Sequence, residues 1–204
     1  MEETMEKVVR GLEAGGFEVI PLRTGKEACK YLLSHIPQGA VVGAGGSVSI
    51  RDTNVLEELA LKGCTVLSTA GAPPQDHARI REQSMRADVY LTSANAITKQ
   101  GQLVLVDGIG NRVGAVSFGP KKVFFVVSHS KVVDGGINTA IARIKKIACP
   151  QNARRLGLKT GCALTGLCEG ETCADSMCRL TLVLDRVPRG REMRVLLVEE
   201  PLGY

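Results

Sequence analysis

The alternation of helical and extended patterns in the first third of the chain is the feature that most constrains its fold. The chain opens with apolar residues at helical spacing, namely Met5, Val8, Val9 and Leu12. After a Gly-Gly pair, the patterns predict a strand at 17–22, a helix at 26–35, a strand at 40–42, a helix around 55–61 and a strand at 64–67. Such alternation predicts parallel strands with helices on the faces of the sheet.

The middle of the chain adds strands at shorter intervals. A loop that holds Gly71, Pro73 and Pro74 leads into a short helix around residues 79–85. Apolar runs then follow at 89–91, 103–106, 113–116 and 123–127. Because so little chain separates these runs, we expect no crossover helices between them, and the middle two are predicted to form a hairpin.

The last third contains one strong helical pattern and one unusual segment. A helix is predicted at 135–148, followed by a polar, cysteine-rich segment at 149–179 and two closing strands at 180–184 and 195–199. The predicted fold class is therefore α/β, with a mixed, largely parallel sheet flanked by helices. We expect residues 1–204 to form a single domain in which the cysteine-rich segment is inserted before the last strands.

The composition of the chain argues against two kinds of partner, nucleic acids and a lipid bilayer. Aromatic residues make up only 3% of the chain, and the bases behind its net charge of +5 are spread along the sequence. This pattern argues against nucleic-acid binding, which uses stacking side chains and clustered bases. The first residues lack the pattern of a signal peptide, and no apolar run reaches the ~18 residues that span a bilayer. We expect a soluble, cytoplasmic protein without a membrane span, whose cysteines are reduced or metal-bound.

A glycine-rich turn follows the strand at 40–42, in the sequence Gly43-Ala44-Gly45-Gly46-Ser47-Val48-Ser49. Glycines permit positive φ and close backbone approach, and the free amides at the start of a following helix favour a bound anion. The candidate ligand-binding residues here are Gly45, Gly46, Ser47 and Ser49. The segment lacks the Gly-Lys-Ser/Thr ending of a Walker A motif and is not a clean G-x-G-x-x-G. A tight strand-to-helix turn with a serine cap is an equally supported interpretation.

A second set of polar residues lies on and after the strands of the middle region. Asn95 offers a donor and an acceptor, and Thr98 offers a hydroxyl. Asp107 ends a strand, Asn111 tolerates turn geometry, and Arg112 can bind a carboxylate or phosphate through two parallel hydrogen bonds. Strand ends in α/β sheets are common ligand sites. The same residues could instead form a simple hairpin turn closed by Asp107 and Asn111.

The segment ADVYLTSANAITKQGQLVLVDGIGNRVGAVSFGPKK at 87–122 resembles the central signature of the lactate-utilisation (LUD) family. The glycine-rich turn resembles that family's G-G-S-x-S element, and VEEPLGY at 198–204 resembles its usual close. The resemblance implies a fold similar to the sugar-isomerase and CoA-transferase superfamily. It also implies a role in the oxidation of L-lactate to pyruvate, as one subunit beside iron–sulfur partner proteins.

His129 follows the apolar run at 123–127. A histidine at a strand end could act as an acid or a base near pH 7, although a lone surface histidine is usually only solvated. The LUD family more often has a glycine and a small polar residue at this place. His129 is therefore a candidate that the resemblance does not support.

Four cysteines, Cys162, Cys168, Cys173 and Cys178, lie in a short stretch with polar neighbours. Thiolates bind Zn²⁺ or iron–sulfur clusters, so these four are candidate ligands for either. Their spacing matches neither zinc ribbons nor ferredoxins. Some of the thiols could instead be buried packing residues or merely exposed.

Three functions stay open from the sequence. The first is an accessory subunit of a lactate-oxidising system that binds a small anionic metabolite. The second is an isomerase or transferase acting on a phosphorylated or CoA-linked metabolite, although no pair of catalytic carboxylates supports it. The third is a metal-binding module whose cysteine segment docks to a partner. A homodimer is an open possibility for the assembly.

Overall fold

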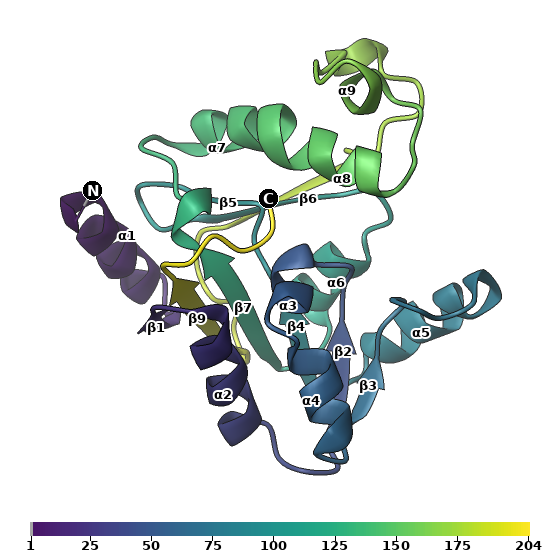
Figure 1. Cartoon of the computed structure of the whole chain (residues 1–204). Coiled ribbons are helices and arrows are strands. Elements are labelled where there is room, and N and C mark those ends of the chain that lie inside the picture. The colour runs from purple at the N-terminus through teal and green to yellow at the C-terminus, as the bar shows by residue number, and fades with distance from the viewer. Residues whose placement is uncertain (1) are drawn as a thin grey trace.

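The computed structural model describes residues 2–204, and its central element is a six-stranded sheet with helices on both faces (Figure 1). The strands lie in the order β1 (Glu18–Leu22), β9 (Glu192–Val198), β7 (Lys122–Ser128), β4 (Val89–Thr92), β2 (Val41–Ala44) and β3 (Thr65–Leu67). Every adjacent pair in this sheet is parallel. The predicted α/β class, with a mixed, largely parallel sheet flanked by helices, is confirmed, although the antiparallel strands form a sheet of their own.

Two groups of helices cover the faces: α2 (Gly25–His35), α3 (Val48–Asp52) and α4 (Val55–Leu61) on one, and α1 (Glu2–Ala14) and α6 (Asn111–Phe118) on the other. Both faces are apolar because successive strand residues point to opposite sides. Leu91 packs into the first core, whereas its neighbour Tyr90 packs into the second. Helix α2 begins where predicted, because the Thr24 hydroxyl accepts a hydrogen bond from the Glu27 amide at 3.2 Å.

A second, antiparallel sheet lies across the carboxyl edge of the first (Figure 1). Its strands are β5 (Ala96–Ile97), β6 (Leu103–Asp107) and β8 (Leu180–Leu184). On its outer side, α7 (Ile137–Arg143) continues through a π-helical turn (Ile144–Ala148) into α8 (Cys149–Arg155). The remaining elements are α5 (His77–Ser84), α9 (Gly161–Leu164) and the 3₁₀ turns η1 (Pro74–Asp76), η2 (His129–Lys131) and η4 (Gly170–Thr172).

The predicted hairpin between 103–106 and 113–116 is wrong. Strand β6 pairs with β5 and β8, and residues 113–116 lie in α6. Asp107 explains the difference, since its Oδ2 accepts hydrogen bonds from the amides of Arg112 and Val113 at 3.0 and 3.2 Å. A carboxylate in this position caps a helix start, so it fixes as helix a short apolar run that could also be a strand.

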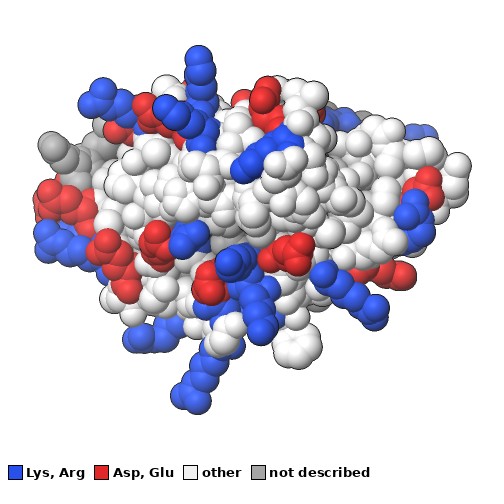
Figure 2. All heavy atoms as spheres, turned by 90° about the horizontal axis from the view of Figure 1, so that it is seen from below, with Lys and Arg blue, Asp and Glu red and all other residues white. Residues whose placement is uncertain are grey.

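Charged side chains of both signs are interspersed on the face seen from below (Figure 2). The net charge of +5 therefore does not collect on that face as one basic surface. Within residues 2–204, none of the helices has the length and apolar character of a membrane span.

The backbone of helix α1 packs directly against the backbone of the turn between β5 and β6. This close packing explains why a glycine, Gly11, stands inside the helix. A Cβ on Gly11 would overlap the carbonyl of Gln100 and lie 3.0 Å from the amide nitrogen of Gly101. Gly114, inside α6, faces only the flexible end of Met85, whose Cε would lie 3.3 Å from a Cβ.

We predict opposite effects of the same substitution at these two helix positions. Gly11→Ala should lower the free energy of unfolding by about 1–3 kcal/mol, because the backbone it meets cannot give way. Gly114→Ala should leave it unchanged or raise it by up to about 1 kcal/mol, because alanine favours the helix. Urea unfolding of the two variants measures this difference. Equal effects at both positions would mean that α1 does not pack this closely.

Candidate functional site

The glycine-rich turn leaves the carboxyl end of β2, between β3 and β4 in the sheet. A Cβ on Gly45 would lie 2.7 Å from Cγ of Arg112 and 3.1 Å from the hydroxyl oxygen of Tyr90. Only glycine therefore lets Arg112 approach the turn. Gly46 is exposed, and a Cβ there would meet no atom within 4 Å. The structure thus brings the turn and Arg112 together beside open space.

The helix after the turn is short, since α3 has only five residues. Ser47 occupies its N-cap position, but the serine hydroxyl makes no capping hydrogen bond. So short a helix has a small dipole, because the dipole sums over aligned peptide units. Positive charge at this edge of the sheet must therefore come mainly from side chains.

Lys131 supplies the most deeply buried of these charges, with 3% of its surface exposed. Its Nζ donates to Oγ of Ser49 at 2.6 Å and to Oγ of Ser93 at 3.2 Å. Ser49 follows β2, Ser93 follows β4, and Lys131 follows β7, which are neighbouring strands. Ser49, Ser93 and Lys131 therefore meet at the carboxyl ends of three adjacent strands.

Burial and, to a lesser extent, repulsion from Arg143 and Arg112 lower the pKa of Lys131 to about 7, and attraction by Asp52 opposes the shift. Arg143 comes from α7 and donates to the carbonyl oxygens of Asn95 and Ser130 at 2.9 and 3.1 Å. We call Lys131, Arg112 and Arg143 the basic cluster.

The basic cluster has little compensating charge. Among the side chains that the structure describes, no carboxylate lies within 4.0 Å of Lys131 or Arg143. Arg112 has Asp107 at 3.9 Å, and its Nη2 donates to the Val106 carbonyl at 2.5 Å. Buried charge is costly unless it is paired, so such a cluster favours an anion.

Asp107 holds Arg112 in place and closes the start of α6. Besides capping the Arg112 amide, it accepts a hydrogen bond from the Gly108 amide at 2.8 Å. Asn111, the first residue of α6, lies by the hydroxyl of Tyr90, whose pKa burial raises to about 12. The Tyr90 hydroxyl therefore stays protonated at neutral pH and can act as a donor.

Asn95 and Thr98 hold the second sheet in place. Oδ1 of Asn95 accepts from the Val106 amide at 3.0 Å, next to the contact with Arg143. Thr98 is fully buried and closes the turn between β5 and β6 through Gln102, at 3.1 Å. Asn95 therefore contacts the basic cluster, whereas the contacts of Thr98 lie at the other end of the β5–β6 pair.

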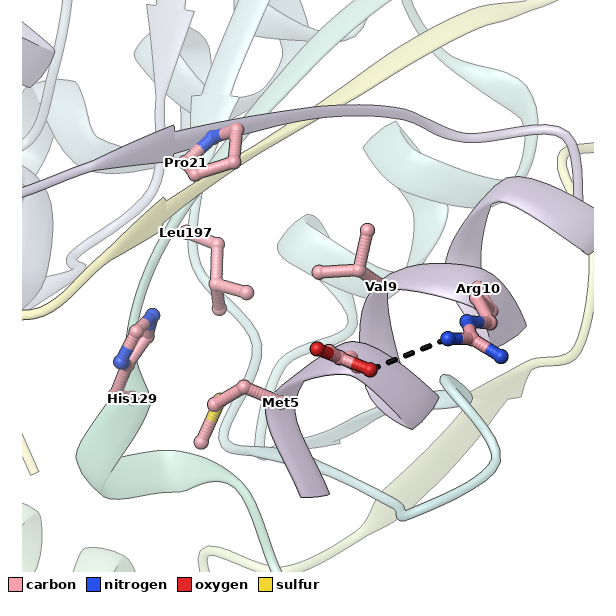
Figure 3. A pocket seen from close by; sticks show the side chains of 7 residues that line it. Met5, Val9, Arg10, Pro21, His129 and Leu197 are labelled. Carbon is pink, nitrogen blue, oxygen red and sulfur yellow. Dashed lines mark hydrogen bonds and ion pairs between the residues drawn. The ribbon is translucent and has the colours of Figure 1, made fainter. Parts of the chain in front are cut away.

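His129 lines a different place, a pocket of about 360 Å³ (Figure 3). The walls of this cavity come from α1, β1 and β9, and its lining is Met5, Glu6, Val9, Arg10, Pro21, His129 and Leu197. Burial lowers the pKa of His129, and Glu199 partly offsets this shift. His129 and Lys131 both lie in η2, but their side chains occupy different sites. His129 lines the pocket beside α1, whereas Lys131 contacts Ser49 in the glycine-rich turn. A catalytic role for His129 stays a prediction.

The four candidate cysteines have different partners. Sγ of Cys178 lies 3.2 Å from Sγ of Cys149, and Sγ of Cys162 lies 3.3 Å from Oγ1 of Thr160. Cys168 is exposed and accepts from the Gly170 amide at 3.4 Å, and Cys173 is half-buried. In the described part of the chain, no three His, Cys, Asp or Glu side chains gather as a metal-binding group. Metal binding by these four cysteines stays a prediction.

Sequence reasoning did not find Lys131, Ser93 or Arg143. A signal for Lys131 was present, because it stands between the apolar run at 123–127 and the two valines at 132–133, shortly after the strand that ends at Ser128. A lysine in such a stretch is buried only for a specific reason.

The Cys149–Cys178 contact predicts selective oxidation. The thiol of Cys149 donates to the sulfur of Cys178 and lowers the pKa of Cys178, which favours its reactive thiolate. Diamide should therefore form a disulfide between these two residues first, as measured by peptide mass spectrometry. Cys149→Ser should abolish that species, and Cys64→Ser should not. Earlier oxidation of Cys168, the exposed thiol, would contradict this prediction.

Comparison with known proteins places the chain in a family. A crystal structure of a DUF162 family protein from Deinococcus radiodurans is similar over 97% of each chain, with a TM-score of 0.56 and 13% sequence identity. At this identity the likeness shows the fold alone. No curated protein matches the chain in sequence. The model of the LUD domain matches residues 5–198, nearly the whole chain, so the chain belongs to the LUD domain family.

Proposed function

We propose that this chain is an accessory subunit of a system that oxidises L-lactate to pyruvate, and that it binds a small anionic ligand. Its membership of the LUD domain family, which is associated with lactate utilisation, supports the first part. The approach of Arg112 to Gly45 and of Lys131 to Ser49 brings two basic side chains to the glycine-rich turn, which supports the second part and is the observation that carries the proposal. The ligand lies over Gly45, Gly46 and Ser47, with Arg112 beside it.

The carboxylate beside Arg112 does not offer the general base that an isomerase needs. Isomerases that move protons between carbons need a general base, and carboxylates often serve as one. Asp107, the carboxylate in contact with Arg112, is already bound to three backbone amides. In this proposal the electrons of lactate pass to iron–sulfur partner proteins in the cytoplasm, and this chain binds the substrate or product anion.

The first test measures binding of candidate anions to the purified chain. Thermal shifts and calorimetry with lactate, pyruvate, sugar phosphates and CoA esters should identify one class that stabilises the folded protein, because a ligand bound only to the native state raises its stability. If none of these anions binds, the ligand part of the proposal is wrong. Turnover of a phosphorylated or CoA-linked metabolite by the isolated chain would instead favour an isomerase or transferase.

We predict that Arg112→Ala weakens binding of that anion by about ten- to a hundredfold, since a charge-assisted hydrogen bond contributes about 1.5–3 kcal/mol. Unfolding should stay cooperative, because Asp107 caps α6 through backbone amides that the variant keeps. The control is Arg86→Ala, an exposed arginine before the amino end of β4. Loss of cooperative unfolding in Arg112→Ala would assign Arg112 to the framework instead.

A further inference from the structure

Lys131 is buried without the partner that a buried ammonium usually has. Its Nζ contacts the hydroxyls of Ser49 and Ser93, and both of these groups are neutral. A buried ammonium is normally paired with a carboxylate, because neutral hydroxyls replace only part of its lost hydration. Among the described residues, Lys131 forms no ion pair with a carboxylate.

The charged groups around Lys131 do not act as its counter-ion. Arg143 from α7 and Arg112 from α6 both repel its charge. Asp52, at the end of α3, attracts it, but this carboxylate is exposed and accepts a hydrogen bond from the Gly203 amide at 2.7 Å. The two hydrogen-bond partners of Nζ, the hydroxyls of Ser49 and Ser93, are neutral.

The segment Leu202–Gly203 covers Lys131 from outside. The Leu202 carbonyl accepts a hydrogen bond from the Ser49 hydroxyl at 3.2 Å, and a Cβ on Gly203 would lie 3.2 Å from Nζ of Lys131. This cover is held by one buried side chain, that of Leu202, and by two hydrogen bonds. It contains no helix or strand, so its displacement breaks no element of the fold.

We propose that Lys131 is the residue that pairs with the carboxylate of the ligand, a small hydroxy or oxo acid, when Leu202–Gly203 moves aside. This inference rests on the proposed function, and it identifies the Lys131 ammonium as the group that binds the anion. The carboxylate supplies a counter-ion to Lys131, and the Ser49 hydroxyl, released from the Leu202 carbonyl, is placed to bond the adjacent hydroxyl or oxo oxygen. Inorganic phosphate would satisfy the same ammonium but not this second contact.

If Lys131 pairs with the carboxylate, the binding constant must depend on pH. A bound carboxylate favours the charged amine, so binding takes up a proton wherever free Lys131 is neutral. The Kd for the carboxylate should therefore be constant below pH 7 and should rise above it by up to about tenfold per pH unit. Calorimetry from pH 6 to pH 9 in buffers with different ionisation enthalpies measures both the Kd and the proton uptake.

The stability of the free protein supplies a second readout. Because the pKa of Lys131 is lowered on folding, the unfolded chain holds more protons between pH 7 and 10.5, and stability rises with pH in that window. Lys131→Met removes the buried amine, so its Tm without ligand should exceed that of the native protein most clearly at pH 6 and less so at pH 9. A lysine that served only to hold the fold together would instead lower the Tm when replaced.

The decisive experiment compares binding of lactate, pyruvate and inorganic phosphate to the native chain, Lys131→Met and Lys146→Met. Lys146 is exposed and serves as the matched control. We expect Lys131→Met to lose carboxylate binding by at least tenfold and to lose its dependence on pH, whereas Lys146→Met keeps both. Hydrogen exchange at the Gly203 amide should speed up when the carboxylate binds.

Each result has a separate meaning. If the native chain binds none of the three anions, the proposed ligand site fails, and this inference fails with it. If the native chain binds lactate or pyruvate with no proton uptake, or if Lys131→Met binds them equally well, only the role of Lys131 is overturned. If Lys131→Met does not fold, the pH profile of the native chain still decides the question. Tighter binding of phosphate than of either carboxylate would overturn the assignment of the ligand class.

Discussion

The packing of the Arg112 side chain on the bare backbone of Gly45 joins two parts of the molecule that are far apart in sequence. Gly45 belongs to the turn after β2 in the parallel sheet, whereas Arg112 lies in the first turn of α6, the helix that follows β6 of the second sheet. A side chain at residue 45 would occupy the volume of Arg112, so the close approach of these two parts depends on a glycine at this position.

The pattern of the first third of the chain was enough to predict its helices and parallel strands. Amphipathic spacing and a Thr24 cap are local signals, and they agree with the packing that the structure shows. The strand predicted at 113–116 is a helix in the structure, and this error also has a physical cause. Its four residues carry no clear period, and a carboxylate several residues upstream decides between strand and helix.

The site itself was only partly predictable. The glycine-rich turn and Arg112 were identified as separate motifs, and their juxtaposition depends on how the strands lie beside each other. Lys131 was missed because its burial requires β7 to lie next to β4 and β4 next to β2, an order that the sequence does not state. Polar residues that look ordinary in sequence acquire a role when a sheet brings strand ends from three places together.

The strand β9 occupies an interior position in the sheet although it is the last strand in the chain, with β1 on one side and β7 on the other. During synthesis on the ribosome, β1 and β7 are made long before the strand that joins them. Each then presents a free backbone edge that can recruit a strand from another molecule. A nascent chain of this kind should depend on chaperones until residues 192–198 have emerged, and a late truncation should be prone to aggregation instead of merely losing a tail.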